Sequence, residues 1–99
     1  MQRLPVFPGG YNKLTEYIHN NLKYPETALK NHIQGTVYMR FYVEVDGSIT
    51  NIKVEDSLST ETDAEALRLV KGFPKWLPAI YAGHPIRFGC LQPIIFKLK

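Results

Sequence analysis

The sequence has almost no cysteine and no long apolar run. Its single cysteine, Cys90, excludes a disulfide within the chain and a zinc site built from several cysteines. No stretch approaches the roughly 20 consecutive apolar residues that a membrane-spanning helix needs. The N-terminus also lacks the basic-then-apolar order of a signal peptide. We therefore expect a soluble piece of protein, which can be part of a longer chain.

A strong charge of either sign is also missing. The 12 basic and 9 acidic residues give a net charge of +3, and the basic residues are scattered along the chain. Nucleic-acid binding normally requires a basic stripe or patch, so we expect no nucleic-acid partner. The 99 residues fit one small domain, predicted as 1–99 with an extended lead-in at 1–10, and 44% hydrophobic residues suffice for one core.

Residue types that carry catalysis or bind metals are present but not grouped. His19, His32 and His84 lie far apart in the sequence, and none has a carboxylate at metal-ligand spacing. Gly9-Gly10 lacks the preceding strand and the following lysine and serine of a phosphate-binding loop. Cys90 lies in an alternating stretch, which is typical of a buried and unreactive thiol. We therefore predict no enzyme, no metal and no cofactor.

The most regular pattern is the stretch Thr36–Val45, in which apolar residues occupy every odd position. A period of two is typical of a β-strand with one buried face, and we expect this strand at the centre of a sheet. Asp46-Gly47 is a strong turn signal, because glycine accepts a positive φ. A second strand follows at Ile49–Val54. Its apolar positions change phase, which predicts a bulge or a late strand start near Ser48.

Two short helices are predicted before this hairpin. The first has an apolar face at helical spacing, made of Tyr11, Leu14, Ile18 and Leu22. The second begins at Tyr24-Pro25-Glu26, with proline at a first helical position, and ends at Asn31-His32. Its buried side is predicted to consist of Ala28, Leu29 and Ile33.

A third helix is predicted after the hairpin, over Asp63–Lys71. Thr62 and Glu65 have the spacing of a capping box at its start. Pro74 prevents its continuation. Its apolar stripe is predicted to consist of Ala66, Leu67, Val70 and Phe73. Trp76, a few residues further on, is expected in the core rather than in a ligand site.

The last segment, Ile86–Lys99, alternates again and contains Pro93. Proline cannot donate a ladder hydrogen bond and is confined to edge strands and bulges. We therefore expect the C-terminal strand beside the first hairpin strand, at the edge of the sheet. The predicted fold class is α+β: a three-stranded antiparallel sheet with helices packed on one face, in which two short helices precede a β-β-α-β core.

An edge strand leaves backbone N–H and C=O groups free, and it can take up an extended peptide as an extra strand. Ile95 and Lys97 would flank such a peptide, and Phe88 and Gly89 mark where it could approach closely. The opposite interpretation is a protected edge, because Pro93 and the lysines also discourage pairing. Edges of this kind can self-pair as well, so a strand-exchanged homodimer is a further alternative.

Motifs along nearly the whole chain resemble, in order, the C-terminal domain of TonB proteins. They are Tyr24-Pro25, Ile33-Gln34-Gly35-Thr36-Val37, Val43-Glu44-Val45-Asp46-Gly47-Ser48-Ile49, Asp63-Ala64-Glu65-Ala66-Leu67, Trp76-Leu77-Pro78-Ala79, Gly83-His84-Pro85-Ile86 and Leu91-Gln92-Pro93-Ile94-Ile95-Phe96-Lys97-Leu98. The lead-in Phe7-Pro8-Gly9-Gly10 with its extra helix looks like TonB-type domains of Bacteroidetes-like bacteria.

The resemblance implies a non-enzymatic periplasmic domain of an energy transducer anchored in the inner membrane. Such domains bind the TonB box of outer-membrane receptors by strand pairing, and so couple the inner-membrane proton gradient to nutrient uptake. The proton-driven inner-membrane complex would be reached through an N-terminal part of the protein. Similar domains also end BlaR-like membrane metallopeptidases, so a sensory or regulatory domain is the alternative.

The resemblance also implies a receptor-binding edge at the end of the chain. It would consist of Phe88, Gly89, Cys90, Leu91, Gln92, Ile94, Ile95, Phe96 and Lys97. The helix that begins at the family motif Tyr24-Pro25 would pack beside this edge.

Overall fold

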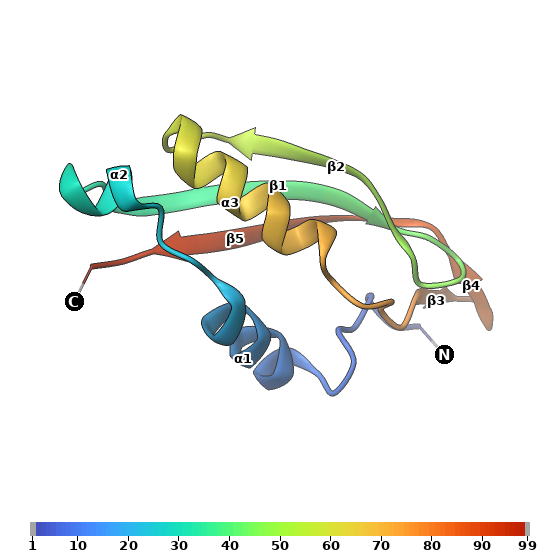
Figure 1. Cartoon of the computed structure of the whole chain (residues 1–99). Helices are drawn as coiled ribbons and strands as arrows, with labels where there is room; N and C mark the ends of the chain where they lie inside the picture. The colour runs from blue at the N-terminus through green and yellow to red at the C-terminus, as the bar shows by residue number, and fades with distance from the viewer. Residues whose placement is uncertain (1, 99) are drawn as a thin grey trace.

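The computed structural model describes residues 2–98, which form an α+β fold (Figure 1). Its elements are α1 (Tyr11–Asn21), α2 (Glu26–Lys30), β1 (Gly35–Val43), β2 (Ile49–Asp56), α3 (Thr60–Lys71), β3 (Ala79–Tyr81), β4 (His84–Ile86) and β5 (Phe88–Phe96). The main sheet is antiparallel with the order β2-β1-β5, and the helices lie on one of its faces. The predicted three-stranded architecture with an edge strand at the C-terminus is therefore confirmed.

The core forms between the helices and the alternating side chains of β1. Val37, Met39, Phe41 and Val43 are fully buried, as the alternation predicts. They pack with buried residues of α3 and β5, namely Ala66, Leu69, Val70, Ile94 and Phe96. Trp76 also belongs to this core, where its ring meets that of Phe41 edge to face at 5.5 Å. Burial of these large side chains against β1 is the main source of stability, at about 1.5–3 kcal/mol for each.

The first strand is shorter than its alternation predicts. β1 ends at Val43, and Val45 is 55% exposed instead of buried. The reason is the tight turn that follows, in which Glu44 accepts the Gly47 N–H at 2.8 Å and donates its own N–H to Ser48 at 2.9 Å. This turn lifts Val45 away from the sheet.

The bulge lies further along the second strand than predicted. β2 begins at Ile49 directly after the turn, and the pairing with β1 slips between Arg40↔Lys53 and Tyr42↔Thr50. Asn51, in this gap, has a φ of 51°. A second slip separates Tyr38↔Asp56 from Met39↔Val54. In both places the extra residue is on β2, which accounts for the phase change of its apolar positions.

The helix faces differ in part from the prediction. Leu14 is buried in α1 as expected, but Tyr11 is 74% exposed, and Tyr17 packs against Phe73 in its place. In α2, Ala28 is buried whereas Leu29 is 45% exposed. Tyr11 is the first residue of α1 and precedes the part of the helix that packs on the core, and in the five residues of α2 only Ala28 is buried.

The third helix begins earlier than predicted, at Thr60, and its N-cap is Ser59 rather than Thr62. The Ser59 side chain accepts the Thr62 N–H, and the Thr62 hydroxyl accepts the Ser59 N–H, so Thr62 completes the capping box from within the helix. Glu65 is consequently free of a capping role and is buried. Leu69, absent from the predicted stripe, is 1% exposed.

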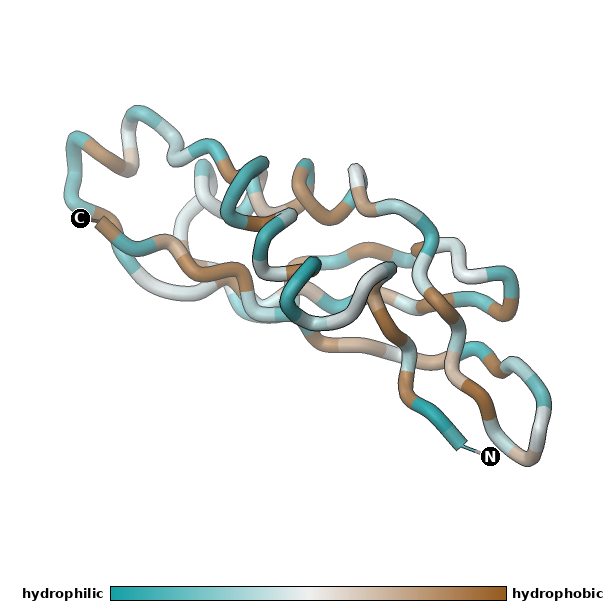
Figure 2. Tube along the Cα trace, turned by 90° about the horizontal axis from the view of Figure 1, so that it is seen from below, coloured by the Kyte–Doolittle hydropathy of each residue, from teal (hydrophilic) through white to brown (hydrophobic). Residues whose placement is uncertain are grey.

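The lead-in and the segment after Trp76 form a small second layer of β-structure that the sequence did not predict. β3 and β4 pair as a hairpin around the expected turn at Ala82-Gly83. The lead-in runs antiparallel to the chain before and in β3 (Figure 2), with reciprocal backbone hydrogen bonds of 2.8–3.0 Å between Arg3 and Ile80 and between Val6 and Leu77. Phe7 then enters the core beside Trp76.

We predict that alanine at Gly47 destabilises the domain more than alanine at Gly83. Both glycines have positive φ values, +89° and +80°, but a Cβ at Gly47 would lie 2.1 Å from the Trp76 carbonyl oxygen, whereas Gly83 faces open space. Gly83→Ala should therefore lower the free energy of unfolding by about 1 kcal/mol, from backbone strain alone, and Gly47→Ala by about 2–3 kcal/mol. Urea unfolding followed by the fluorescence of Trp76 measures both. Equal losses would mean that the turn does not press on the tryptophan segment.

Candidate functional site

The two outer edges of the main sheet differ in regularity. β5 pairs with β1 in unbroken register along all of its nine residues, from Val43↔Phe88 to Gly35↔Phe96. The β2 edge is interrupted by two bulges and carries the positive φ of Asn51. Bulges of this kind discourage further pairing, whereas a long regular edge permits it. The β5 edge is therefore the one suited to an additional strand.

The turn between β1 and β2 determines which backbone groups of β5 point outward. Glu44 donates its N–H to the Ser48 carbonyl, on the β2 side. The backbone N–H and C=O groups of even-numbered β1 residues therefore point toward β2, and those of odd-numbered residues point toward β5. With the observed register, the β5 residues bonded to β1 are Phe88, Cys90, Gln92, Ile94 and Phe96. Those whose backbone points outward are Gly89, Leu91, Pro93 and Ile95. Pro93 thus occupies an outward position, where its missing N–H costs the sheet nothing.

The side chains of β5 divide in the same way. Ile94 and Phe96 are buried beneath the helices, whereas Leu91 and Ile95 are 52% and 60% exposed on the face of the sheet that the helices leave open. Lys97 follows the end of the strand and is exposed. The predicted edge residues from Phe88 to Phe96 therefore form one strand, in which some side chains anchor it to the core and other residues point their backbone groups outward, whereas Lys97 lies outside the strand.

Cys90 and Gly89 have structural explanations within the sheet. Cys90 is half-buried, and this burial raises the pKa of its thiol, which keeps the sulfur protonated and unreactive. Gly89 lies opposite Tyr42, and a Cβ on Gly89 would be 3.3 Å from the tyrosine ring. The guanidinium of Arg87 covers the same ring at 3.6 Å. The missing side chain of Gly89 thus makes room for a cross-strand aromatic residue.

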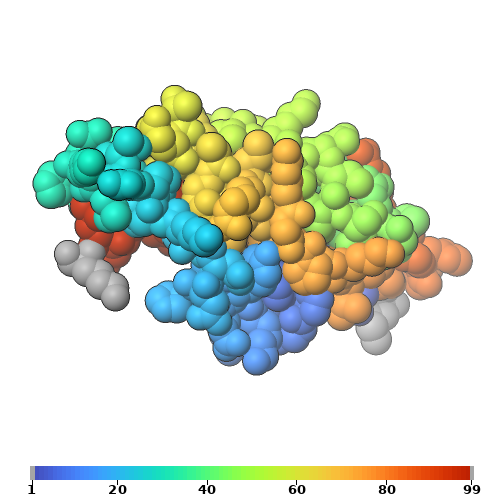
Figure 3. Space-filling model, viewed as in Figure 1, coloured from blue at the N-terminus to red at the C-terminus, as the bar shows by residue number. Residues whose placement is uncertain are grey.

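A groove runs beside the β5 edge, on the side of the helices. It has a volume of about 430 Å³ and lies between α1 and β5. The space-filling view shows the hollow between α1, in blue, and the end of β5, in red (Figure 3). Its lining consists of Tyr11, Thr15, Ile18, His19, Leu22, Tyr24, Gln92, Pro93 and Ile95. None of these side chains is a carboxylate, a lysine or an arginine.

The Tyr24-Pro25 motif forms the back of this groove. The Tyr24 ring meets the Phe96 ring edge to face at 5.6 Å, and its hydroxyl donates a hydrogen bond to the Ile33 carbonyl. Pro25 is the N-cap of α2 rather than its first helical residue as predicted, because its ψ of 138° is extended. The motif therefore lies beside β5 and presents an aromatic ring whose polar end is already satisfied.

Glu65, which the sequence interpretation assigned to a capping box, holds this part of the chain in place. Its carboxylate accepts the Lys23 backbone N–H at 2.6 Å and two hydrogen bonds from Arg68 at 2.7 and 2.8 Å. Arg68 also donates to the Asn21 carbonyl at 2.8 Å. The side chain of Glu65 is only 9% exposed. No local motif could have revealed this role, since it joins α3 to the linker between α1 and α2.

The surroundings of Glu65 lower its pKa. Burial alone would raise the pKa by disfavouring the charged carboxylate, but the hydrogen bonds from Arg68 and from the Lys23 N–H outweigh that effect. A carboxylate with a lowered folded-state pKa stabilises the fold above its unfolded pKa of about 4.3, and this contribution is lost as the pH falls through the folded-state pKa.

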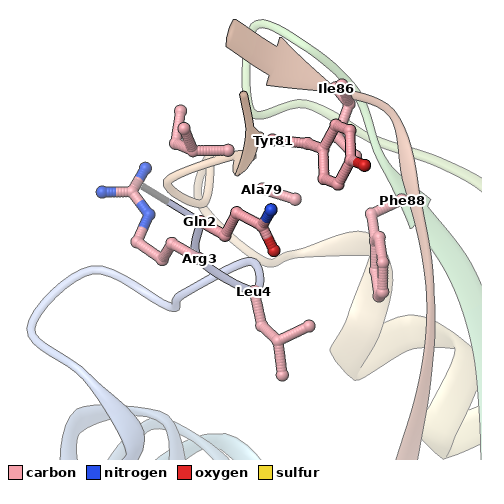
Figure 4. Close-up of a pocket in the computed structure, with 8 residues that line it drawn as sticks. Gln2, Arg3, Leu4, Ala79, Tyr81, Ile86 and Phe88 are labelled. Carbon is pink, nitrogen blue, oxygen red and sulfur yellow. The ribbon is translucent and has the colours of Figure 1, made fainter. Parts of the chain in front are cut away.

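Two smaller hollows flank the lead-in. One of about 270 Å³ is lined by the lead-in, the β3–β4 hairpin and Phe88, and Figure 4 shows Leu4, Tyr81 and Phe88 around it. The other, of about 310 Å³, lies between Pro5–Phe7, Trp76 and Gln92. Neither brings carboxylates, histidines or the cysteine together.

Metal-binding and membrane-spanning features are absent from the described part of the chain. Residues 2–98 contain no group of three or more His, Cys, Asp or Glu side chains that could hold a metal ion. His19, His32 and His84 are exposed and lie in α1, in the turn after α2 and in β4, respectively. No helix in this range is both long and apolar enough to cross a bilayer.

Fold and edge together define a class: small α+β domains in which one long, regular strand edge is left free beside a helix-lined groove. The model of the family described as "Gram-negative bacterial TonB protein C-terminal" matches residues 20–98. The chain therefore belongs to the family of TonB C-terminal domains. This is a non-enzymatic, transport-associated family, and it agrees with the resemblance seen in the sequence motifs.

Two solved structures support the same conclusion. Both are solution structures of the Helicobacter pylori TonB C-terminal domain. One has 28% sequence identity and a TM-score of 0.66, and the match covers 88% of this chain and 91% of that one. The other has 27% identity and a TM-score of 0.66, with 93% and 87% covered. No curated protein gives a significant match. Family and structures support a TonB-type energy transducer as the protein to which this domain belongs.

We predict that Glu65→Gln destabilises the domain in a pH-dependent way. The substitution removes the charge that Arg68 and the Lys23 N–H require, and should lower the free energy of unfolding by about 1–3 kcal/mol at neutral pH. The difference from the unmodified domain should shrink as the pH falls below the unfolded pKa of about 4.3 and on through the lowered folded-state pKa of Glu65. Denaturant unfolding at several pH values measures it.

Glu61→Gln is the matched control, since Glu61 lies in the same helix but is exposed. It should change the free energy of unfolding by less than about 0.5 kcal/mol. A Glu65→Gln variant as stable as this control would show that the carboxylate does not hold the linker.

Proposed function

We propose that this chain is a periplasmic domain that binds the TonB box of outer-membrane receptors as an additional strand on the β5 edge. The observation that carries the proposal is the set of outward backbone groups along an edge in unbroken register. Family membership supports outer-membrane receptors as the partners. In this proposal the proton-driven inner-membrane complex acts through a part of the protein N-terminal to the domain, and no catalytic group takes part.

Binding of this kind relies on the backbone more than on side chains. Gly89, Leu91 and Ile95 offer outward N–H and C=O groups, whereas the Pro93 C=O already accepts a hydrogen bond from the Gln92 side chain at 3.2 Å. Each hydrogen bond formed with the peptide contributes about 0.5–1.5 kcal/mol net. The strand itself is held by β1 on its inner side and by Ile94 and Phe96 in the core, so it is ordered before the peptide arrives. Such preorganisation reduces the entropy lost on binding.

The edge also has features that limit unwanted pairing. Pro93 interrupts the row of outward donors, and Lys97 places a positive charge at the end of the strand. A strand-exchanged homodimer would use the same groups as a receptor peptide and would compete with it. The TonB box is favoured as the occupant because the family to which the chain belongs works with receptors.

We predict that proline at an outward position weakens peptide binding and leaves the fold intact. Leu91→Pro and Ile95→Pro each remove one outward N–H and none that bonds to β1. Affinity for a TonB-box peptide should fall about three- to tenfold for each variant, which corresponds to the loss of one hydrogen bond. The measurement is a titration of the labelled domain followed by NMR, in which the amides of Gly89, Leu91 and Ile95 should shift most.

Leu91→Ala and Ile95→Ala are the matched controls, because they remove the same side chains and keep the N–H groups. They should bind within about twofold of the unmodified domain if pairing is through the backbone. The proposal would be overturned if the amide chemical shifts from Phe88 to Lys97 did not change on addition of peptide. It would also be overturned if the proline variants bound the peptide as tightly as their alanine controls.

A further inference from the structure

The groove between α1 and β5 gives the free edge a second, side-chain-selective component. We propose that it takes two large uncharged side chains, at positions i and i+2, from a peptide strand added to β5. This inference rests on the proposed strand addition and deepens it, because it states which peptide sequences the edge should prefer. α1 spans Tyr11–Asn21 and so lies almost entirely before residue 20, where the family match begins.

The pleat of the sheet determines which side chains of an added strand would enter the groove. An added strand would lie about 4.8 Å outside β5, and its side chains would alternate between the two faces of the sheet. One face is open, and the other is where the helices lie. The groove is lined by α1 on one side and by Gln92, Pro93 and Ile95 on the other, so helix-facing side chains of the added strand would enter it. This holds for a parallel or an antiparallel peptide.

The chemistry of the lining favours apolar or aromatic side chains. Tyr11, Thr15, Ile18, His19 and Leu22 form a stripe along α1 at helical spacing, with no charged carboxylate, lysine or arginine among the lining residues. The hydroxyls of Thr15 and Tyr24 already donate to the carbonyls of Asn12 and Ile33. A charged side chain placed here would lose hydration without gaining a partner of opposite charge.

The groove also exposes apolar surface that a ligand would cover. Tyr11, on the α1 wall of the groove, is 74% exposed. The volume of the groove, about 430 Å³, lies within the range of ligand sites. Side chains at i and i+2 of a strand are about 6.6 Å apart on one face, so a groove that extends from Gln92 to Ile95 accommodates both.

Three synthetic peptides of matched length test the inference. The first, Thr-Ile-Thr-Ile-Thr, places both isoleucines on one face, and the second replaces them with alanine. The third, Thr-Ile-Ile-Thr-Thr, has the composition of the first but can turn only one isoleucine toward the groove. By NMR titration, the first should bind about tenfold more tightly than the second and clearly more tightly than the third.

A variant that fills the groove provides the second arm. Thr15→Trp places a large ring in the groove from an exposed position of α1, and should reduce the preference for the first peptide over the second to within about twofold. Glu16→Trp, on the outer side of the same helix, is the matched control and should keep the preference. Thermal unfolding of both variants shows that the fold is retained.

The outcomes separate this inference from the proposed strand addition. If the β5 amide resonances shift but the three peptides bind with equal affinity, the inference that the groove selects side chains is overturned and the proposed strand addition is retained. The absence of any shift on β5 with all peptides, the TonB-box peptide included, would overturn both. Shifts of groove residues that depend on protein concentration alone would identify a second copy as the occupant, and would overturn the inference.

Discussion

The pairing of β1 with a strand on each side is the interaction on which the rest of the structure depends. Its buried side chains, from Val37 to Val43, form the floor of the core, and its backbone bonds hold β2 and β5 in place. Both bulges are on β2, so β1 itself stays regular and pairs with β5 in an unbroken register. The regular edge that defines the candidate site is therefore a consequence of the central strand.

Local rules in the sequence were sufficient for the main architecture. The alternation around Phe41 marks a half-buried strand wherever it occurs, and Pro93 restricts its own strand to an edge. The predicted start of α3 was wrong for a physical reason. Ser59 and Thr62 form one capping box, Thr62 and Glu65 have the spacing of another, and only the burial of Glu65 against Lys23 decides between them. Contacts between distant parts of the chain cannot be derived from the spacing within one segment.

The strand that forms the candidate site could be predicted from the sequence, but its outward-facing residues and the neighbouring groove could not. Proline chemistry indicated the edge, and the resemblance to TonB domains indicated its partner. The identity of the outward residues depends on the register with β1 and on the turn at Glu44, both of which are tertiary facts. The groove depends on where α1 docks, and Tyr11 was assigned to the core when it lies on the groove wall. A short amphipathic helix does not reveal which of its margins will be covered.

The orientation of β5 has a mechanical consequence. The molecule measures 50 × 23 × 17 Å, and the sheet strands run along its length (Figure 1). A tensile load applied along β5 would act in shear on the ladder to β1, so all of the hydrogen bonds between the two strands would resist it together. A load across the strands would break the same bonds one after another, as in a zip. A peptide paired lengthwise with β5 would be gripped in the stronger of these two geometries.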